Sequence, residues 1–314
     1  MQAEVLWQMA FAVCVKYGCS YTVKALSTVY CTINGNKHMT TWTQIASTVT
    51  LSGRKQKLNV NILMHLGVLY LSEKLRQMLN DPNSYAAIYM YGSNGDGGLW
   101  KSRNVPAKYS DCWLEDLPIE KDNPVGYKSI VKYVNNVVDY VDQKHLGLFL
   151  YSVPNAENRM GTGLGKTCSA VTVLNHYLYE RLRLHLRGYQ LITDNPCYFL
   201  KMNDLQTAFN QQFRGGFSNK DEAADRYFRI KDRASKVDLL VLDDIGMRPS
   251  SEAFTDELYS LLDQRVTDEK TTIYTSNIGL QELSDYIGDR VVSRIAGSTV
   301  AVPFKGKDHR RSVL

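Results

Sequence analysis

Long hydrophobic runs are missing from this chain of 314 residues. No stretch reaches the roughly 18 consecutive apolar residues that a membrane-spanning helix needs. The apolar segment Val5–Val15 has no basic residue before it, so it predicts a core helix rather than a signal peptide. We therefore expect a cytoplasmic protein with no membrane partner.

Cysteine is also scarce, and six cysteines in this length exclude a small scaffold held together by disulfides. Residues of the types that zinc prefers do gather near the N-terminus, at Cys14, Cys19, Cys31 and His38. Their spacing matches no compact zinc-finger pattern, so buried free thiols are the alternative to a Zn2+ site. We expect the remaining cysteines to be small core residues: Cys112, Cys168 and Cys197.

Acidic residues are few in the first third of the chain. Residues 1–103 hold ten Lys and Arg against four Asp and Glu, whereas residues 104–314 hold 27 against 28. The positive potential of the N-terminal third fits nucleic acid or an acidic protein surface as a partner. A solvated face of mixed charge is the alternative.

A turn-rich run, Gly92–Gly98, interrupts the chain and cannot hold a regular element. With roughly 100–200 residues per domain, the length predicts two domains, which we place at 1–103 and 104–314. Within the first, the leucine spacing over Asn61–Asn80 indicates a helix. The polar segment Thr40–Gln56 fits a small helical or winged-helix module.

Apolar strand patterns alternate with helical patterns after this boundary. Strands are predicted at 146–153, 198–202, 237–242 and 271–276, and helices at 166–186, 203–213 and 252–266. Repeated strand–helix units indicate a parallel sheet covered on both faces, with ligands at the carboxyl ends of the strands.

The strongest local motif follows the first of these strands and consists of Gly161, Thr162, Gly163, Leu164, Gly165, Lys166 and Thr167, with Cys168 next. Glycines allow backbone N–H groups to surround phosphate oxygens, and the following helix adds its positive end. Lys166 would reach the β- and γ-phosphates, and Thr167 would bind magnesium (Mg2+). A glycine-rich turn with an incidental lysine is the alternative. Met160 stands where a P-loop normally begins with glycine, which puts the loop geometry in question.

Two acids follow the strand predicted at 237–242. Asp243 is expected to hold the magnesium shell, and Asp244 to orient and deprotonate the attacking water. Asn277, at the end of the next strand, is placed to position that water. A helix cap or turn is the alternative for each residue alone, but their order after Lys166 favours a nucleotide site.

Arg290 and Arg294 lie four residues apart after Gly288, and therefore on one helix face. An arginine there fits an arginine finger that acts on the nucleotide of a neighbouring subunit. Two surface arginines are the alternative.

Residues 104–314 resemble the ATPase domain of bacterial and phage replicative helicase loaders, the DnaC/DnaI group of AAA+ proteins. The resemblance rests on the ordered motifs GTGLGKT, LLVLDDIG, TSN, GDRVVSR and GKDHR, which IstB-type transposition ATPases largely share. It implies a Walker A role for Lys166 with Thr167 and a Walker B role for Asp243 with Asp244. It also implies sensor 1 at Asn277, an arginine finger at Arg294, with Arg290 as second choice, and sensor 2 at Arg310.

The resemblance also implies partners. In this family the N-terminal domain grips the replicative helicase, a DnaB-type ring, and in some members it binds zinc. Single-stranded DNA is the other expected ligand, and we predict its contacts at Phe213, Arg214, Phe217 and Arg229. Interleaved acids make a solvated helix face the alternative there. A self-oligomer, ATP and Mg2+ are implied as well, in the cytoplasm of a bacterium or of a phage-infected host.

We therefore predict an α/β AAA+ P-loop ATPase domain, with a parallel sheet flanked by helices, and a smaller, mostly helical N-terminal domain. The predicted function is ATP-dependent loading of a replicative helicase onto single-stranded DNA. The alternatives are an IstB-type transposition helper ATPase and a nucleotide-binding adaptor with little hydrolysis, the latter motivated by Met160.

Overall fold

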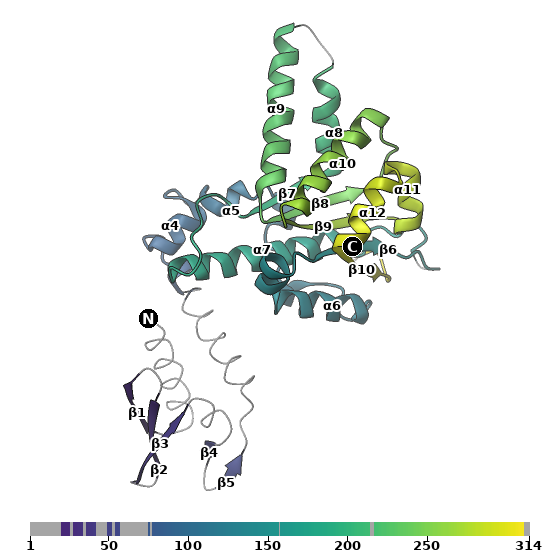
Figure 1. Cartoon of the computed structure of the whole chain (residues 1–314). Coiled ribbons are helices and arrows are strands. Elements are labelled where there is room, and N and C mark those ends of the chain that lie inside the picture. The colour runs from purple at the N-terminus through teal and green to yellow at the C-terminus, as the bar shows by residue number, and fades with distance from the viewer. Residues whose placement is uncertain are drawn as a thin grey trace. The chain divides into compact units, whose positions relative to one another are not determined.

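A computed structural model describes residues 75, 77–156, 158–213 and 217–310, together with five strands within residues 20–56 (Figure 1). The chain divides into two compact units, residues 1–87 and 88–314. No helix among the described residues is long and apolar enough to cross a bilayer.

The first unit contains two antiparallel sheets. A three-stranded sheet has the order β1-β2-β3, and a separate hairpin pairs β4 with β5. These strands are β1 Ser20–Ala25, β2 Thr28–Ile33, β3 Asn36–Thr41, β4 Val49–Leu51 and β5 Arg54–Gln56. Their sequences are rich in Thr, Val and Tyr, which favour extended backbone.

The segment Thr40–Gln56, expected to fit a small helical or winged-helix module, contains β4 and β5, so its described residues do not fit the purely helical form of that expectation. The expectation of a mostly helical N-terminal domain is therefore not met by the described residues of 20–56. The apolar segment Val5–Val15 and most of the helix predicted over Asn61–Asn80 lie outside the described residues, although 77–80 are helical. The functional boundary at residue 103 stays a prediction.

The second unit is built on a five-stranded parallel sheet with the order β10-β6-β9-β8-β7. Its strands are β6 Gly147–Ser152, β7 Cys197–Lys201, β8 Leu239–Ile245, β9 Thr271–Ser276 and β10 Thr299–Phe304. The strands predicted from apolar runs are confirmed to within three residues at each end. The continuous apolar character of β8 reflects burial on both faces of the sheet.

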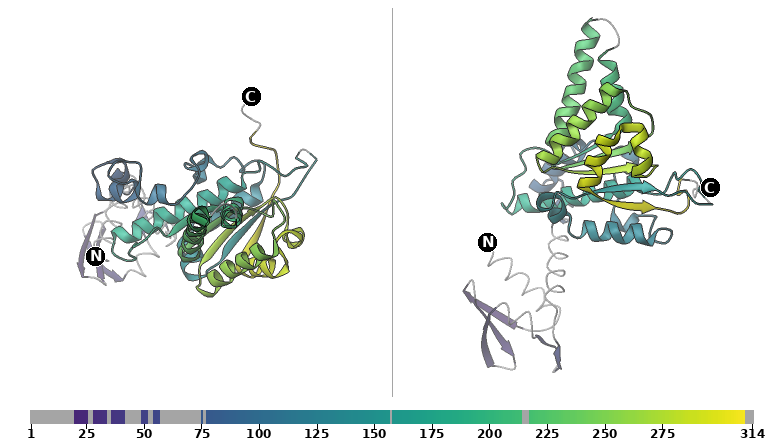
Figure 2. Two further views of the ribbon diagram at one scale, coloured as in Figure 1. Left: turned by 90° about the horizontal axis from the view of Figure 1, so that it is seen from above. Right: turned by 45° about the vertical axis from the view of Figure 1, so that its right-hand side comes forward.

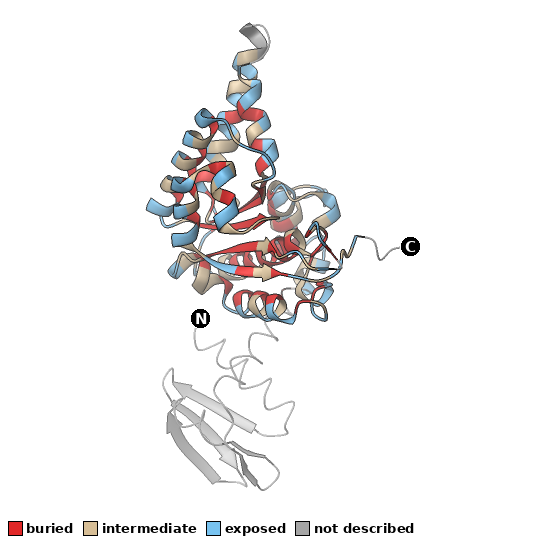
Figure 3. Ribbon diagram, turned by 90° about the vertical axis from the view of Figure 1, so that its right-hand side faces the viewer, coloured by how far each residue is buried: buried red, intermediate tan, exposed pale blue. Residues whose placement is uncertain are grey.

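Helices cover both faces of this sheet (Figure 2). The helix α7, Lys166–Leu186, lies on one face next to α6, Pro124–Val134. The other face shares one hydrophobic cluster with five helices. These are α8 Met202–Gln211, α9 Phe217–Lys236, α10 Glu252–Thr267, α11 Leu280–Ile287 and α12 Asp289–Ser298. The strands β6, β7, β8 and β9 are thereby mostly buried between the two helix layers, whereas the edge strand β10 is partly exposed (Figure 3).

Short elements connect these layers. They are α4 Tyr85–Tyr91, α5 Gly98–Ser102, the 3-10 turns η1 Ala107–Tyr109 and η2 Leu114–Asp116, and the π turn η3 Asp139–Gln143. The helices α8 and α9 form a hairpin that projects beyond the sheet (Figure 1).

A buried arginine ties the base of the hairpin to the sheet. The Arg265 guanidinium donates to the carbonyl of Ala234, in the last turn of α9, at 2.6 Å and to the carbonyl of Val237, just after that helix, at 2.9 Å. It also donates to the Thr271 carbonyl and the Thr272 hydroxyl at the start of β9. These acceptors satisfy a charge that is almost completely buried, so α9, α10 and β9 are joined at one point.

Candidate functional site: a nucleotide-binding edge of the sheet

The glycine-rich motif forms the loop between β6 and α7, as predicted. Gly161, Gly163 and Gly165 all have positive φ, of +59°, +67° and +84°. A Cβ atom at Gly163 would lie 1.7 Å from the Asp308 carboxylate, and one at Gly165 would lie 2.6 Å from the Ile119 side chain. Only glycine meets both the backbone and the space requirement at these two positions.

Met160 does not fill the loop. Its side chain is 78% exposed, and it has no positive φ. The residues before it are held by asparagine side chains: Asn155 accepts from the amide of Asn158 at 2.6 Å, and Asn158 donates to the Thr162 carbonyl at 2.7 Å. The departure from the usual first glycine therefore leaves the interior of the loop clear.

Lys166 is buried at the start of α7 and points toward the carboxyl ends of the strands. Its Nζ donates to Ser152 Oγ at 2.6 Å, to Asn277 Oδ1 at 2.9 Å and to the Gly161 carbonyl at 3.3 Å. Burial, assisted by the positive charge of Arg310, lowers the pKa of Lys166 to about 8 against the opposing effect of Asp244. An anion at this loop would raise the pKa of Lys166 again and favour its charged form.

The two acids stand at the end of β8, beside the same loop. Asp243 Oδ1 accepts from the Thr167 hydroxyl at 3.0 Å and from the Thr275 hydroxyl at 2.7 Å. Burial and the negative charge of Asp244 raise the pKa of the Asp243 carboxyl to about 6. Asp244 itself has a left-handed backbone, with φ of +58°. The tertiary fold thus brings residues 76 positions apart into direct contact.

Two polar residues of this site were missed in the sequence. Ser152 ends β6 and contacts Lys166, while Thr275 on β9 contacts Asp243. Both hydroxyls lie at carboxyl ends of parallel strands, and that position was the available signal. Thr275 is also the first residue of the TSN motif, in which the sequence assigned a role only to Asn277.

The C-terminal segment closes over the loop. The His309 amide donates to the Gly163 carbonyl at 3.0 Å, and the Arg310 amide donates to the Asp308 carboxylate at 3.0 Å. Arg310 lies close enough to Lys166 to lower the pKa of the lysine. Arg310, more than 140 positions after the glycine-rich loop in the sequence, therefore lies near that loop.

The donor set fits a magnesium ion. Thr167 and Asp243 offer a hydroxyl and a carboxylate oxygen 3.0 Å apart, and Mg2+ prefers hard oxygen ligands. Magnesium usually takes only one or two carboxylates and completes its shell with water and phosphate. The described residues contain no cluster of three or more His, Cys, Asp or Glu side chains that could hold a metal ion by themselves.

Comparison with known proteins agrees with this geometry. Residues 200–310 match the family model of the IstB-like ATP binding protein. The replicative helicase loader DnaC of Buchnera aphidicola (subsp. Baizongia pistaciae) is 23% identical over 210 residues, which cover 65% of this chain and 72% of that protein. The Escherichia coli K12 loader DnaC is 24% identical over 152 residues, which cover 48% of this chain and 54% of that protein. Over about two thirds of its length this chain is therefore similar to the DnaC-type replicative helicase loaders.

Solved structures of similar fold include a DnaC helicase loader, at 22% identity and a TM-score of 0.46, covering 64% of this chain and all of that one. A DnaI structure has 19% identity and the same TM-score, covering 64% of this chain and 95% of that one. The predicted resemblance to DnaC-type and IstB-type proteins is confirmed by the sequence comparisons, and the predicted α/β fold, a parallel sheet flanked by helices, is confirmed by the strand order and helix packing.

The two candidate finger residues of this DnaC relative lie apart from the P-loop, on α12. Arg294 forms an ion pair with Asp263 at 2.7 Å and donates to the Tyr259 hydroxyl at 3.1 Å. The Arg290 guanidinium stacks over the same tyrosine ring, 4.4 Å from its centroid. Both arginines are thus held against α10 within their own chain.

The predicted nucleic-acid residues belong to the α8–α9 hairpin. Phe213 is exposed at the end of α8, whereas Arg214 lies outside the described residues and only the backbone of Phe217 is described, at the start of α9. Arg229 lines a hollow of about 410 Å³ at the base of the hairpin. That hollow also receives the side chains of Arg226 and Arg233.

The predicted zinc residues are described only in part. Cys14 and Cys19 lie outside the described residues. Cys31 on β2 and His38 on β3 are direct partners in the antiparallel register. The zinc site stays a prediction.

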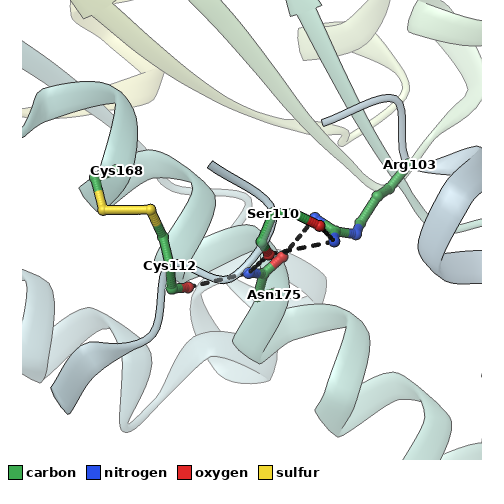
Figure 4. Close-up of a disulfide and its surroundings, with 5 residues drawn as sticks. All are labelled: Arg103, Ser110, Cys112, Cys168 and Asn175. Carbon is green, nitrogen blue, oxygen red and sulfur yellow. Dashed lines mark hydrogen bonds between the residues drawn. A yellow bond between two sulfur atoms is a disulfide. The ribbon is translucent and has the colours of Figure 1, made fainter. Parts of the chain in front are cut away.

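A disulfide joins Cys112 to Cys168, with their Cα atoms 5.6 Å apart (Figure 4). Cys112 and Cys197 are buried, as expected of small core residues, whereas Cys168 is half-buried, and the bond between Cys112 and Cys168 was not predicted. The bond links the segment before α6 and β6 to the first turn of α7. Cys168 in that turn directly follows Thr167. No spacing rule in the sequence reveals a pair separated by 56 positions.

A buried polar network supports the disulfide. The Asn175 amide donates to the carbonyls of Ser110 and Cys112, each at 3.0 Å, and accepts from Arg103 at 3.0 Å. Arg103 also donates to Ser110 Oγ at 2.9 Å (Figure 4). The segment that carries Cys112 is therefore fixed to α7 by hydrogen bonds as well as by the covalent bond.

Loss of the disulfide is expected to lower the free energy of unfolding by about 2–4 kcal/mol, since it closes a loop of 56 positions in the unfolded chain. Thermal melting of the full chain with and without a dithiol reductant measures this change. The Cys112→Ser variant is the control: it should melt at the lower temperature and no longer respond to the reductant. Equal melting temperatures for the oxidised and reduced wild type would contradict the stabilising role.

Proposed function

We propose that this chain is an ATPase that loads a ring-shaped replicative helicase onto single-stranded DNA. The observation that carries the proposal is a pair of hydrogen bonds that join the start of α7 to the carboxyl ends of β8 and β9. Thr167 bonds to Asp243, and Lys166 bonds to Asn277 across 111 positions of sequence. The relatives named replicative helicase loader DnaC support the cellular role.

ATP would bind with its phosphates in the loop between β6 and α7. The backbone N–H groups around Gly163 and the N-terminus of α7 face that position, and Lys166 supplies the nearest cation. Magnesium, held by Thr167 and Asp243, would neutralise phosphate charge when bound. Arg310 would add a second positive charge from the C-terminal segment.

Asp244 would act as the base for the attacking water, and Asn277 would orient that water. Asp244 has a left-handed backbone and Asp243 does not, and the two acids would serve different tasks. The Asn277 amide oxygen already lies 2.9 Å from Lys166 and so marks the edge of the phosphate position.

Arg294 would complete the site of a neighbouring subunit in a self-oligomer. The ion pair with Asp263 and the bond to Tyr259 hold the arginine at the surface of α12 in the single chain. Assembly would exchange this ion pair for the γ-phosphate of the neighbour, and Arg290 is the second candidate. Nucleotide hydrolysis would then loosen the contact between subunits.

The domain at 1–103 would grip the DnaB-type helicase, and Zn2+ at Cys14, Cys19, Cys31 and His38 would be structural if present. The α8–α9 hairpin would contact single-stranded DNA through Phe213, Arg214, Phe217 and Arg229. The arginines around the hollow at its base add positive potential for a phosphate backbone. This function places the protein in the cytoplasm of a bacterium or of a phage-infected host.

A second candidate function is that of an IstB-type transposition helper ATPase, which the match of residues 200–310 to the IstB-like family model favours. Co-purification with a transposase rather than with a replicative helicase would distinguish it. The third, an adaptor with little hydrolysis, is weakened by the outward position of Met160, which leaves the loop open.

Lys166→Ala is expected to abolish ATP binding, because it removes the main cation of the loop. Asp244→Asn is expected to retain binding and lose turnover, since asparagine tolerates the left-handed backbone and Asp243 is unchanged. Titration of a fluorescent ATP analogue and phosphate release measure the two effects. The exposed Lys128→Ala variant on α6 is the matched control. Normal hydrolysis by Asp244→Asn would refute the assignment of the base.

Arg294→Ala should bind ATP almost normally and hydrolyse it about 10³-fold more slowly, as expected for loss of a finger. Mixing it with Lys166→Ala chains should restore part of the phosphate release, because each chain supplies what the other lacks. Asp263→Asn breaks the ion pair but keeps the arginine, so it should hydrolyse ATP normally. If Asp263→Asn instead behaves like Arg294→Ala, the arginine serves only its own chain.

The full chain should form a complex with the replicative helicase of its host, and the fragment 88–314 should not. The cut at 88 keeps Arg103, which is buried against Asn175 in the second unit. Size-exclusion chromatography with the purified helicase measures the complex, and nucleotide binding by the fragment checks its folding. A complex of equal stability with the fragment would place the helicase contact on the ATPase domain.

A further inference from the structure

One buried hydroxyl contacts both acids of the site. Thr275, in β9, is completely buried. Its Oγ1 donates to Asp243 Oδ1 at 2.7 Å and accepts from the backbone amide of Asp244 at 2.9 Å. A hydroxyl has one proton to give, so this side chain uses its donor on the first acid and an acceptor lone pair on the second.

The second of these bonds lies where the β8–β9 pairing is irregular. Leu242 pairs with Tyr274, but the next pair is Ile245 with Ser276, so the register shifts between them. Asp244 lies in this gap with a left-handed backbone, a conformation that is unfavourable for most non-glycine residues. The Thr275 hydroxyl receives the Asp244 amide in the gap and so stabilises the turn.

The first bond fixes the rotation of the Asp243 carboxylate. Oδ1 accepts from Thr275 on one side and from Thr167 on the other, so the three oxygen atoms form a chain from β9 through β8 to α7. Without Thr275 the carboxylate keeps only the Thr167 contact on that oxygen in the described structure. The orientation of Asp243 would then depend on a residue that also has to meet the ligand.

We propose that Thr275 is a positioning residue for both acids. It aims Asp243 at Thr167 for magnesium binding, and it holds the backbone turn that directs the Asp244 carboxylate toward the nucleotide. The inference rests on the proposed nucleotide function and adds to it a residue that contacts neither nucleotide nor metal. Hydrogen-bond partners of metal ligands typically change metal affinity or activity by about 10–100-fold when they are removed.

The test compares two substitutions at the same atom. Thr275→Val keeps the shape of the side chain and removes the hydroxyl, whereas Thr275→Ser keeps the hydroxyl and removes a methyl group. Thr271→Val is the matched control, because Thr271 is also buried in β9 and donates to the Val141 carbonyl at 3.0 Å, at the opposite end of the strand. Thr275→Ala provides a second hydroxyl-free variant if Thr275→Val does not fold.

Two readouts separate positioning from structural support. Affinity for a non-hydrolysable fluorescent ATP analogue, measured against Mg2+ concentration, reports on Asp243, and kcat of phosphate release reports on Asp244. For half-maximal binding of the analogue, Thr275→Val should need an Mg2+ concentration about 10–100-fold higher than the wild type. Its kcat of phosphate release should fall by a similar factor. Thr275→Ser should stay close to the wild type in both. Thr271→Val should lower the melting temperature but leave both readouts unchanged.

Failure of this proposal differs from failure of the proposed function. Thr275→Val with the Mg2+ dependence and kcat of the wild type would overturn the positioning role while leaving the nucleotide site intact. Equal losses in Thr275→Val and Thr271→Val would also overturn it, because they would point to general destabilisation. A wild-type chain without Mg2+-dependent binding of the analogue would overturn both.

Discussion

The hydrogen bond between Thr167 and Asp243 is the contact on which the rest of the site depends. It joins the start of α7 to the end of β8, so it fixes the glycine loop relative to the two acids. Each partner is also held from outside: Asp243 by Thr275, and the first turn of α7 by the disulfide at Cys168. The site is therefore preorganised by its own chain, as efficient electrostatic stabilisation requires.

Burial sets the electrostatics of this edge of the sheet. It lowers the pKa of Lys166 and raises the pKa of Asp243, so both groups are shifted toward their neutral forms. Perturbed pKa values of neighbouring groups cluster at functional sites. A bound phosphate would favour the charged lysine, which is one physical reason for nucleotide to stabilise this arrangement.

The opposite edge of the sheet supplies rigidity. Arg265 donates hydrogen bonds both to carbonyls at the C-terminal end of α9 and to the carbonyl of Thr271 at the start of β9. Asp238 pairs with Arg181 at 2.6 Å and with Lys270 at 2.7 Å, which ties α7 to the strands at their amino ends. These pairs lower the pKa of Asp238 despite its burial. With the amino ends of the strands fixed, small side chains such as Thr275 suffice to position the chemistry at their carboxyl ends.

The sequence by itself determined the parallel sheet, its flanking helices and the order of the motifs, because hydrophobic periodicity and glycine spacing are local properties. It singled out Lys166 and Thr167 as candidates because they open a predicted helix after a glycine-rich run, and Asp243 and Asn277 because each directly follows a predicted strand. It did not reveal Thr275, Ser152 or the bond from Cys112 to Cys168. Those contacts join residues far apart in the chain, and a hydroxyl or thiol has the same local pattern in a site as in a core.

Tertiary structure alone also decided how the arginines are placed. Helical spacing put Arg290 and Arg294 on one face of α12, but only the packing of α12 on α10 brought Tyr259 and Asp263 to them. In the first unit, the segment Thr40–Gln56 was expected to fit a small helical or winged-helix module, and the structure shows that Val49–Leu51 pairs with Arg54–Gln56 in a hairpin there. Short polar strands carry a weak periodic signal, and their pairing with a neighbouring strand decides whether they form.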